Sequence, residues 1–306
     1  MKQQSNVHLQ QKQSDRSDKS KLKIYYELTK PRLSILSVFT ATAGYLIARP
    51  HFDPLLLLAL VTGTALAAGS AGVLNQWIER EIDARMKRTR SRPIPSGEAD
   101  PKETLVYGFT LGLVGCLLLW IGVHTLAALL ALATLISYLL IYTPLKKKGP
   151  WSTEIGTIPG ALPPLIGWTA AEGTITLLGW ILFALLIAWQ MPHFMAIAWL
   201  FREDYRQAGL PMLSVVDSSG RSVGRKSLIY SVLVLIISLS PWVLGYTTLF
   251  YGIAALGTGI YLLLKALRFW SEPDSDPAAR KLFFASIIYL PITMIPLIID
   301  RCLLNG

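Results

Sequence analysis

The chain has 306 residues, of which 52% are hydrophobic and only 16% are charged, and its mean hydropathy is +0.45. A composition this apolar excludes a soluble globular domain and indicates a polytopic membrane protein. The net charge of +10 does not call for a nucleic-acid partner, because basic loops beside an anionic leaflet, together with an acidic substrate, account for it.

Nine apolar segments predict nine transmembrane helices in one all-α domain, residues 24–306. The preceding residues, 1–23, are rich in Gln, Ser and Lys and predict a disordered cytoplasmic tail. The predicted helices are about Leu33 to Ile47, Pro54 to Leu74, Leu105 to Val123, Leu126 to Tyr142, Ile155 to Ala170, Thr176 to Leu200, Leu228 to Leu244, Leu249 to Leu267 and Leu282 to Ile299.

The distribution of basic residues predicts the orientation of these helices. A cytoplasmic N-terminus places 27 of the 29 lysine and arginine residues on the inner side, and only Arg49 and Arg301 on the outer side. The positive-inside rule therefore supports nine spans with the long, charged loops in the cytoplasm. A bacterial inner membrane is the expected location, with the mitochondrial inner membrane as the alternative.

Three oxygen-bearing side chains follow the second apolar segment. Asn75, Glu79 and Asp83 are spaced at i, i+4 and i+8, which places them on one face of a helix. Such oxygen ligands suit Mg²⁺, and a neighbouring set of cations suits a diphosphate. A solvated helix end followed by a positive-inside loop is the alternative interpretation. The cations are Arg85, Lys87, Arg88, Arg90 and Arg92.

Two later stretches also stand out. The fifth segment contains GTIPGALPPLIGW, whose prolines and glycines would break an isolated helix. It indicates either a kink that lets helices pack closely or a wall that lines a substrate. After the sixth segment, Glu203 and Asp204 stand between Arg202 and Arg206, on the same predicted side as the first acidic motif. The two acidic clusters would suit a two-sided metal site over one central cavity.

Five stretches in order resemble the UbiA superfamily of intramembrane prenyltransferases, and within it the branch that farnesylates haem. They are NQWIEREIDARMKRTRSRP, YTPLKKKG, GALPPLIGW, WQMPHF and REDYRQAG. The superfamily motif is Asn-x-x-x-Asp-x-x-x-Asp, and this chain has Glu79 in its middle position, as the haem branch does. Two positions depart from the family pattern. Leu200 stands four residues before Asp204, where a second acid is usual, and Ser152 stands where relatives often have Asn.

The resemblance implies transfer of a farnesyl group from farnesyl diphosphate to a vinyl group of haem B, with water addition, to give haem O. It implies Mg²⁺ as the cofactor, the lipid bilayer as the surroundings, and a haem A synthase or an oxidase-assembly protein as a partner. The implied catalytic and metal-binding residues are Asn75, Glu79, Asp83 and Asp204, and the implied diphosphate-binding residues are Arg88, Arg92, Tyr142 and Lys146.

The haem site is predicted from three further residues. His193, in WQMPHF about three turns before Asp204, is either a structural histidine or a group that ligates the haem iron or bonds a propionate. Lys30 and Arg32 in TKPR either pair with haem propionates or the diphosphate, or anchor lipid headgroups.

Two alternative functions remain open at this point. One is a UbiA-type enzyme that prenylates an aromatic quinone precursor. The other is a secondary transporter for an anionic solute, which would also use broken helices and inner-side cations. A transporter does not need acids aligned at i, i+4 and i+8, so the motif favours an enzyme. Product analysis distinguishes the three.

Overall fold

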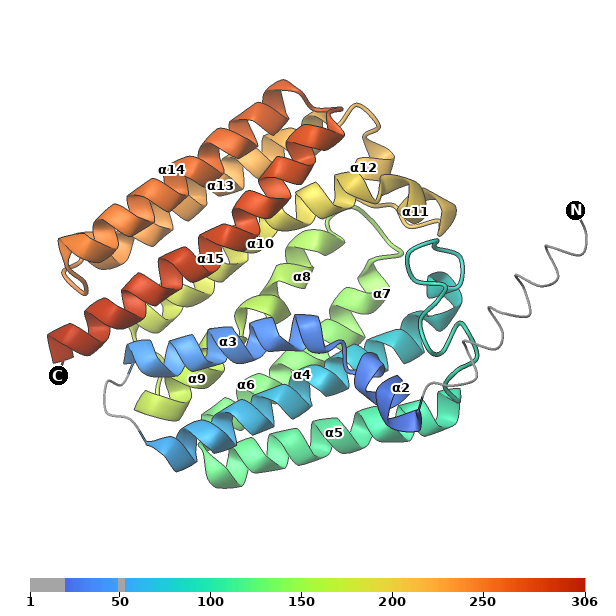
Figure 1. Ribbon diagram of the computed structural model, residues 1–306, viewed down its shortest axis with the longest axis horizontal. Helices are drawn as coiled ribbons and strands as arrows, with labels where there is room; N and C mark the ends of the chain where they lie inside the picture. The colour runs from blue at the N-terminus through green and yellow to red at the C-terminus, as the bar shows by residue number, and fades with distance from the viewer. Residues whose placement is uncertain (1–19, 49–52, 306) are drawn as a thin grey trace, which may run out of the picture.

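The computed structural model describes residues 20–48 and 53–305, and these form an all-helical bundle (Figure 1). The elements are α2 (Lys21–Leu28), α3 (Pro31–Ala48), α4 (Pro54–Asp83), α5 (Pro101–Gly122), α6 (Thr125–Ile136), the π-helix η1 (Ser137–Tyr142), α7 (Thr143–Leu145), α8 (Ser152–Ala161), α9 (Pro163–Glu172), α10 (Leu177–Leu200), α11 (Arg202–Gln207), α12 (Leu213–Val216), α13 (Arg221–Val243), α14 (Leu249–Ser271) and α15 (Asp276–Asn305). Most of the predicted tail, residues 1–19, and Arg49 lie outside the described residues.

Eight helical segments among the described residues are long and apolar enough to cross a membrane. They are α3, α4, α5, the continuous run from α6 to α7, α10, α13, α14 and α15. The polytopic all-α fold is therefore confirmed, but a count of nine is not. The fifth predicted segment is divided into α8 and α9, of ten residues each, with the break at Leu162. Pro163 and Pro164 lack an amide hydrogen and cannot donate to the carbonyl oxygens of the preceding turn, which explains the break although Leu162 keeps helical dihedral angles.

Several helices begin before the predicted apolar segments. The helix α13 begins at Arg221 rather than near Leu228, and α15 begins at Asp276 rather than near Leu282. Charged residues can continue a helix beyond its apolar part, so hydropathy underestimates its length. The short helix α2 begins at Lys21, inside the range predicted to be a disordered tail.

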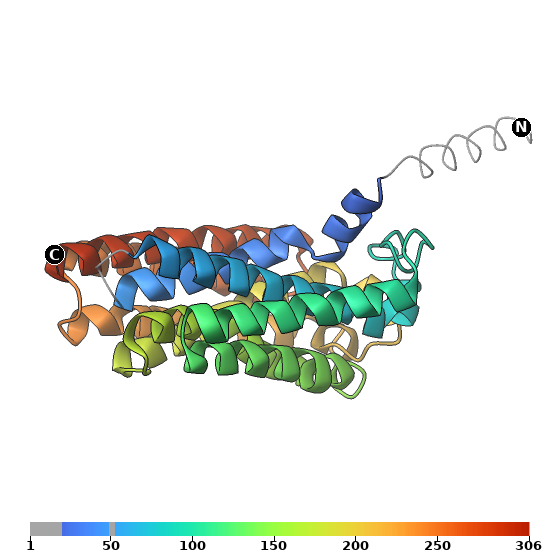
Figure 2. The same ribbon diagram turned by 90° about the horizontal axis from the view of Figure 1, so that it is seen from below.

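The long helices form a closed ring. Each packs against its neighbour in the order α3, α4, α5, α6, and α10, α13, α14, α15; α8 and α9 connect the two series, and α15 packs against α3. The helices run along the long axis of the molecule (Figure 2). The loop 84–100, α2, α11 and α12 gather at one end, and the C-terminus lies at the other (Figure 1).

The broken fifth segment both packs closely and lines a cavity. A methyl group at Gly44 of α3 would overlap the carbonyl oxygen of Pro164, and one at Gly167 of α9 would overlap that of Ala41. Glycine therefore allows α3 and α9 to approach to backbone contact. Gly156 and Gly160 of α8 instead line an internal cavity. The predicted close packing is thus found in α9, and α8 lines a cavity; the role of this wall toward a substrate stays a prediction.

Buried hydrogen bonds join α15 to α14 and to α3 at the end of the bundle that carries the C-terminus. The buried Asp300 of α15 accepts hydrogen bonds from the amide of Thr248 at 2.7 Å, from its hydroxyl and from the amide of Tyr251, and so caps α14. The next residue, Arg301, donates to the carbonyl oxygen of Ile47 at the end of α3. A basic residue on the predicted outer side is thus explained by a structural role.

We expect Asp300→Ala to lower the stability of the protein by about 2 kcal/mol, because it leaves the backbone amides of Thr248 and of the buried Tyr251 without their acceptor. Thermal unfolding in detergent measures the effect. Asp53→Ala is a matched control, since Asp53 caps α4 in the same way but at an exposed position. An Asp300→Ala melting temperature no lower than that of Asp53→Ala would contradict the assignment.

Candidate active site

The end of α4 forms a platform for the junction between α2 and α3. Gln76 donates a hydrogen bond of 2.7 Å to the carbonyl oxygen of Leu28, and Gly72 lies so close to Thr29 that a methyl group at 72 would be 3.0 Å from its carbonyl oxygen. Lys30 then has φ of 49°, a left-handed conformation that is rare outside glycine. The junction turns Lys30 toward α4.

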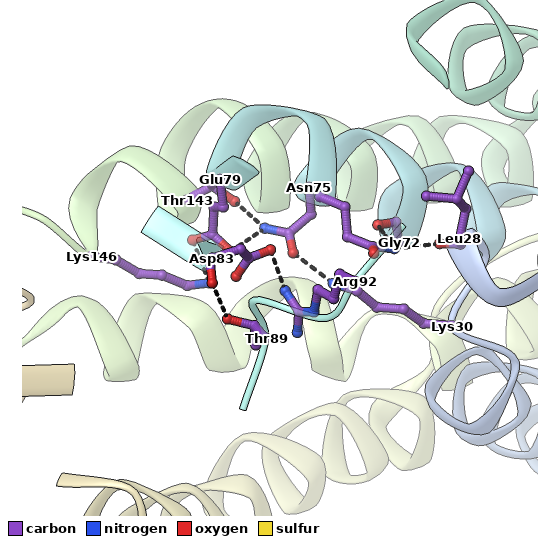
Figure 3. Close-up of polar contacts among 11 residues, drawn as sticks. Leu28, Lys30, Gly72, Asn75, Glu79, Asp83, Thr89, Arg92, Thr143 and Lys146 are labelled. Carbon is purple, nitrogen blue, oxygen red and sulfur yellow. Dashed lines mark hydrogen bonds and ion pairs between the residues drawn. The ribbon is translucent and has the colours of Figure 1, made fainter. Parts of the chain in front are cut away.

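Asn75, Glu79 and Asp83 lie on one face of α4, as the spacing predicted, and all three are buried (Figure 3). The amide nitrogen of Asn75 donates to Glu79 at 2.9 Å, which leaves the amide oxygen to accept from Lys30 at 2.7 Å. The carboxylates are therefore held at fixed positions inside the protein and are not a solvated helix end.

Three cations face this acidic row. Lys146 donates to Glu79 at 2.8 Å, and Arg92 pairs with Asp83 at 2.5 Å. The hydroxyl of Thr89 donates to the backbone oxygen of Asp83, which turns the loop after α4 back toward the helix. When Lys30 is protonated, Lys30, Arg92 and Lys146 together carry one positive charge more than the two carboxylates, so the cluster has charge left for an anion.

The two lysines differ in their protonation. Burial, followed by the positive charge of Arg92, lowers the pKa of Lys30 to about 7. Burial also opposes the charge on Lys146, but the carboxylate of Glu79 outweighs it and raises the pKa of Lys146 above the ordinary value for lysine. Lys146 is thus a permanent cation at neutral pH, whereas the charge of Lys30 depends on the groups around it.

The donor set fits Mg²⁺. The oxygen Oδ1 of Asp83 is buried and has no hydrogen-bond partner in the described part of the chain, so it is available to a cation. An amide and two carboxylates match the ligand types and the number that Mg²⁺ takes alongside substrate phosphates. No cluster of three or more His, Cys, Asp or Glu suited to a metal is found among residues 20–48 and 53–305.

Three predicted site residues lie at the edge of this cluster. Asp204 accepts a hydrogen bond of 3.1 Å from the backbone amide of Arg88, and so contacts the loop that follows α4. The side chain of Arg88 instead packs on the ring of Phe201, with its guanidinium carbon 4.7 Å from the ring centroid. Arg32 is exposed at the start of α3, away from the polar contacts around Asn75.

An apolar cavity of about 310 Å³ lies inside the ring of helices next to the cluster. Lys30 and Tyr142 line it from the side of the acidic row, and Gln190 and His193 of α10 line it from the opposite side. The ring of His193 is stacked between Trp189, at 5.5 Å, and Phe283 of α15, at 5.1 Å. The cavity thus joins the predicted diphosphate residues to the predicted haem residue.

The comparison with known proteins agrees with this geometry. Residues 37–288 match the model of the UbiA prenyltransferase family. The chain belongs to this family. A UbiA-family relative from Opitutus terrae, named protoheme IX farnesyltransferase, is 52% identical over 93% of this chain and 97% of its own. The resemblance to the UbiA superfamily, which rested on five sequence stretches, is confirmed.

Solved structures show the same fold. A chain from a structural study of digeranylgeranylglyceryl phosphate synthase has a TM-score of 0.78 at 22% identity, over 92% of this chain and 98% of that one. A UbiA homologue from Archaeoglobus fulgidus bound to DMAPP and Mg²⁺ has a TM-score of 0.63 at 14% identity, over 89% of this chain and 98% of that one. Distant members of the UbiA family therefore bind Mg²⁺ together with a prenyl diphosphate.

The structure adds Thr143 to the UbiA-type site. Its hydroxyl accepts a hydrogen bond from the amide nitrogen of Asn75 at 3.3 Å and donates one to the backbone oxygen of Tyr138 at 2.8 Å. The π-helix before Thr143 directs Tyr138 and Tyr142 to the cavity, and Lys146 lies over the ring of Tyr142. The sequence analysis missed Thr143; its position one helical turn before Lys146 could have marked it as a candidate, but not its contact with Asn75.

We expect Thr143→Val to raise the Mg²⁺ concentration needed for half-maximal activity by roughly fivefold, the equivalent of about 1 kcal/mol for one hydrogen bond. The variant keeps the shape of the side chain but removes the acceptor that orients Asn75. Thr143→Ser should restore most of the loss. Thr110→Val is the matched control, because the Thr110 hydroxyl bonds only within the exposed face of α5. Equal Mg²⁺ dependence in the Val variants at 143 and 110 would remove Thr143 from the site.

Proposed function

We propose that the chain transfers the farnesyl group of farnesyl diphosphate to a vinyl group of haem B, with addition of water, to form haem O. The observation that carries this proposal is the meeting of Asn75, Glu79 and Asp83 with three cations beside an apolar cavity. The name of the Opitutus terrae relative, protoheme IX farnesyltransferase, supports the choice of substrates.

The reaction begins with rupture of the bond between C1 of the farnesyl group and the diphosphate oxygen, which leaves an allylic cation. The protein must therefore stabilise negative charge on the leaving oxygens. Lys30, Arg92 and Lys146 supply the opposing positive charge. The buried site strengthens the attraction between these groups and the diphosphate by excluding water. In the free protein these cations contact Asn75, Asp83 and Glu79. Binding of a diphosphate would provide them with a competing partner and release the oxygens of the acidic row.

The released oxygens of Asn75, Glu79 and Asp83 would hold Mg²⁺. When bound, Mg²⁺ neutralises charge on the leaving diphosphate. Asp204 is assigned to the opposite side of the same site, because its carboxylate contacts the loop between Asp83 and Arg92 through the amide of Arg88. The Archaeoglobus fulgidus homologue bound to DMAPP and Mg²⁺ supports this use of the fold.

The cavity is assigned to the apolar parts of the two substrates. Tyr142 and the neighbouring wall of α8 would contact the farnesyl chain, and His193 lies where the haem would approach. Lys30 is assigned to the diphosphate rather than to haem, since it contacts Asn75 directly. The exposed Arg32 remains available to a haem propionate or a lipid headgroup.

For the membrane orientation, we infer that the N-terminus is cytoplasmic and that α8 and α9 together form a ninth crossing, which places α11 and α12 on the same, cytoplasmic side as the loop 84–100. The site then faces the compartment that supplies farnesyl diphosphate and Mg²⁺. A bacterial inner membrane is the inferred location.

Product analysis of membranes tests the choice of substrate. Membranes from cells that express the chain should accumulate haem O, and membranes from cells that express Asp83→Asn should not. A prenylated aromatic acid in place of haem O would instead assign the chain to quinone biosynthesis. Absence of both products, with the protein present and folded, would contradict prenyl transfer and revive the transporter interpretation.

A further inference from the structure

The wall that α10 presents to the cavity carries two hydrogen-bond acceptors. The first belongs to His193. Its ring nitrogen Nδ1 lies 2.9 Å from the hydroxyl oxygen of Ser286, and this hydroxyl donates its own hydrogen to the backbone oxygen of Phe283 at 2.6 Å. The hydroxyl can therefore only accept from the imidazole, so Nδ1 carries the hydrogen and Nε2 has a free lone pair.

The second acceptor belongs to Gln190, one turn before His193. The amide nitrogen of Gln190 donates to two backbone oxygens, those of Thr157 and Leu186, at 3.0 Å each. Two acceptors around the nitrogen fix the orientation of the amide. The oxygen Oε1 then points toward Gly160, where a methyl group would overlap it, and it has no donor within the part of the chain that the structure describes. Both residues line the cavity.

Two acceptors three residues apart suit a molecule that donates two hydrogen bonds, and water is the smallest that does so. A water molecule that gives one hydrogen to Nε2 of His193 and the other to Oε1 of Gln190 presents an oxygen lone pair to the cavity. We propose that His193 and Gln190 hold and activate the water that becomes the hydroxyl group of the product. This inference rests on the proposed function and assigns a step of it.

The terminal vinyl carbon forms a bond to C1 of the farnesyl group as the bond between C1 and the diphosphate oxygen breaks. This addition leaves a cation on the other vinyl carbon, next to the porphyrin ring. The water oxygen bonds to that cation, and its proton passes to Nε2 of His193. Without a held water the cation loses a proton from the adjacent CH₂ group, and the product is an alkene lighter by one water.

Ligation of the haem iron by His193 is the competing role for the same lone pair. A ring nitrogen that ligates the iron cannot also accept a proton from water. The two roles therefore predict different products when His193 is replaced.

The test is the ratio of hydroxylated to dehydrated farnesyl haem, measured by mass spectrometry after reaction of the purified protein with haem B, farnesyl diphosphate and Mg²⁺. His193→Phe keeps the ring stacking but removes the lone pair, and we expect the ratio to fall by roughly a hundredfold. His193→Gln, which provides an acceptor again, should restore part of it. His124→Phe is the control, because His124 caps α6 beside Gly173 and does not line the cavity.

The ratio does not depend on how much protein folds, so a destabilised variant still gives an answer. If His193→Phe is too unstable to purify, Ser286→Ala, which removes the group that fixes the tautomer, should lower the ratio in the same direction but less. An unchanged ratio in either variant would overturn the inference. So would loss of a haem absorbance band in His193→Phe with an unchanged ratio, which would assign His193 to the iron. If the wild type itself forms no farnesyl haem, the proposed function fails, and this inference fails with it.

Discussion

Glu79→Gln and Asp83→Asn are each expected to lower turnover by about 10² to 10³-fold while the protein remains folded in the membrane. Both changes keep the shape of the side chain but remove a negative charge from the oxygens that would hold Mg²⁺. Asp83 is the more sensitive of the two, because its Oδ1 is buried without a partner and has no other evident use. Turnover with haem B and farnesyl diphosphate measures the loss.

Glu81→Gln is the matched control for both variants. Glu81 lies on the same helix between the two acids, but its side chain is 80% exposed, on the opposite face. It should keep full activity. Asp100 is not a suitable control, because it caps α5 by accepting from the amides of Lys102 and Glu103, so its replacement would affect stability. Near wild-type turnover in Asp83→Asn would contradict the metal assignment.

Arg92→Ala is expected to lower kcat/KM for farnesyl diphosphate by about 10²-fold, since a guanidinium that contacts phosphate forms strong, charge-assisted hydrogen bonds. Arg92→Lys should restore only part of the loss, because an ammonium group cannot reproduce the planar, bidentate contact. Initial rates over a range of farnesyl diphosphate concentrations measure the effect.

Arg88 provides the comparison for this prediction. The two arginines lie in one loop and both match basic positions of the family motif, but only Arg92 contacts the acidic row. The side chain of Arg88 packs on Phe201. Arg88→Ala should therefore have the smaller effect on kcat/KM. An equal or larger effect would mean that Arg88 turns toward the diphosphate when substrate binds.

The helix spacing made part of the site predictable from sequence. Residues at i, i+4 and i+8 share a face wherever a helix is long enough, so the alignment of Asn75, Glu79 and Asp83 needed no tertiary information. The family resemblance predicted Lys146 at the diphosphate, but not its ion pair with Glu79. The contacts that the structure adds, from Thr143 to Asn75 and from Lys30 to Asn75, join segments far apart in the chain. Neither could be derived from local spacing.

The remaining differences also have physical causes. Hydropathy detects apolar length but not continuity, so the segment 155–170 was predicted as one helix although Pro163 and Pro164 divide it. Asp204 was predicted to contribute to the metal site from the second acidic motif; the sequence did not predict that its carboxylate accepts a hydrogen bond from the amide of Arg88. Local sequence does not determine how a loop such as 84–100 folds back on its neighbours.

The most direct test of the account is a reaction of the purified protein in detergent with haem B and farnesyl diphosphate, with Mg²⁺ or with a chelator in its place. Liquid chromatography with mass detection identifies the haem product. The account predicts haem O with Mg²⁺ and none with the chelator, together with release of one diphosphate for each haem O formed. Haem O formation that is unaffected by the chelator, or unmodified haem B under both conditions, would contradict it.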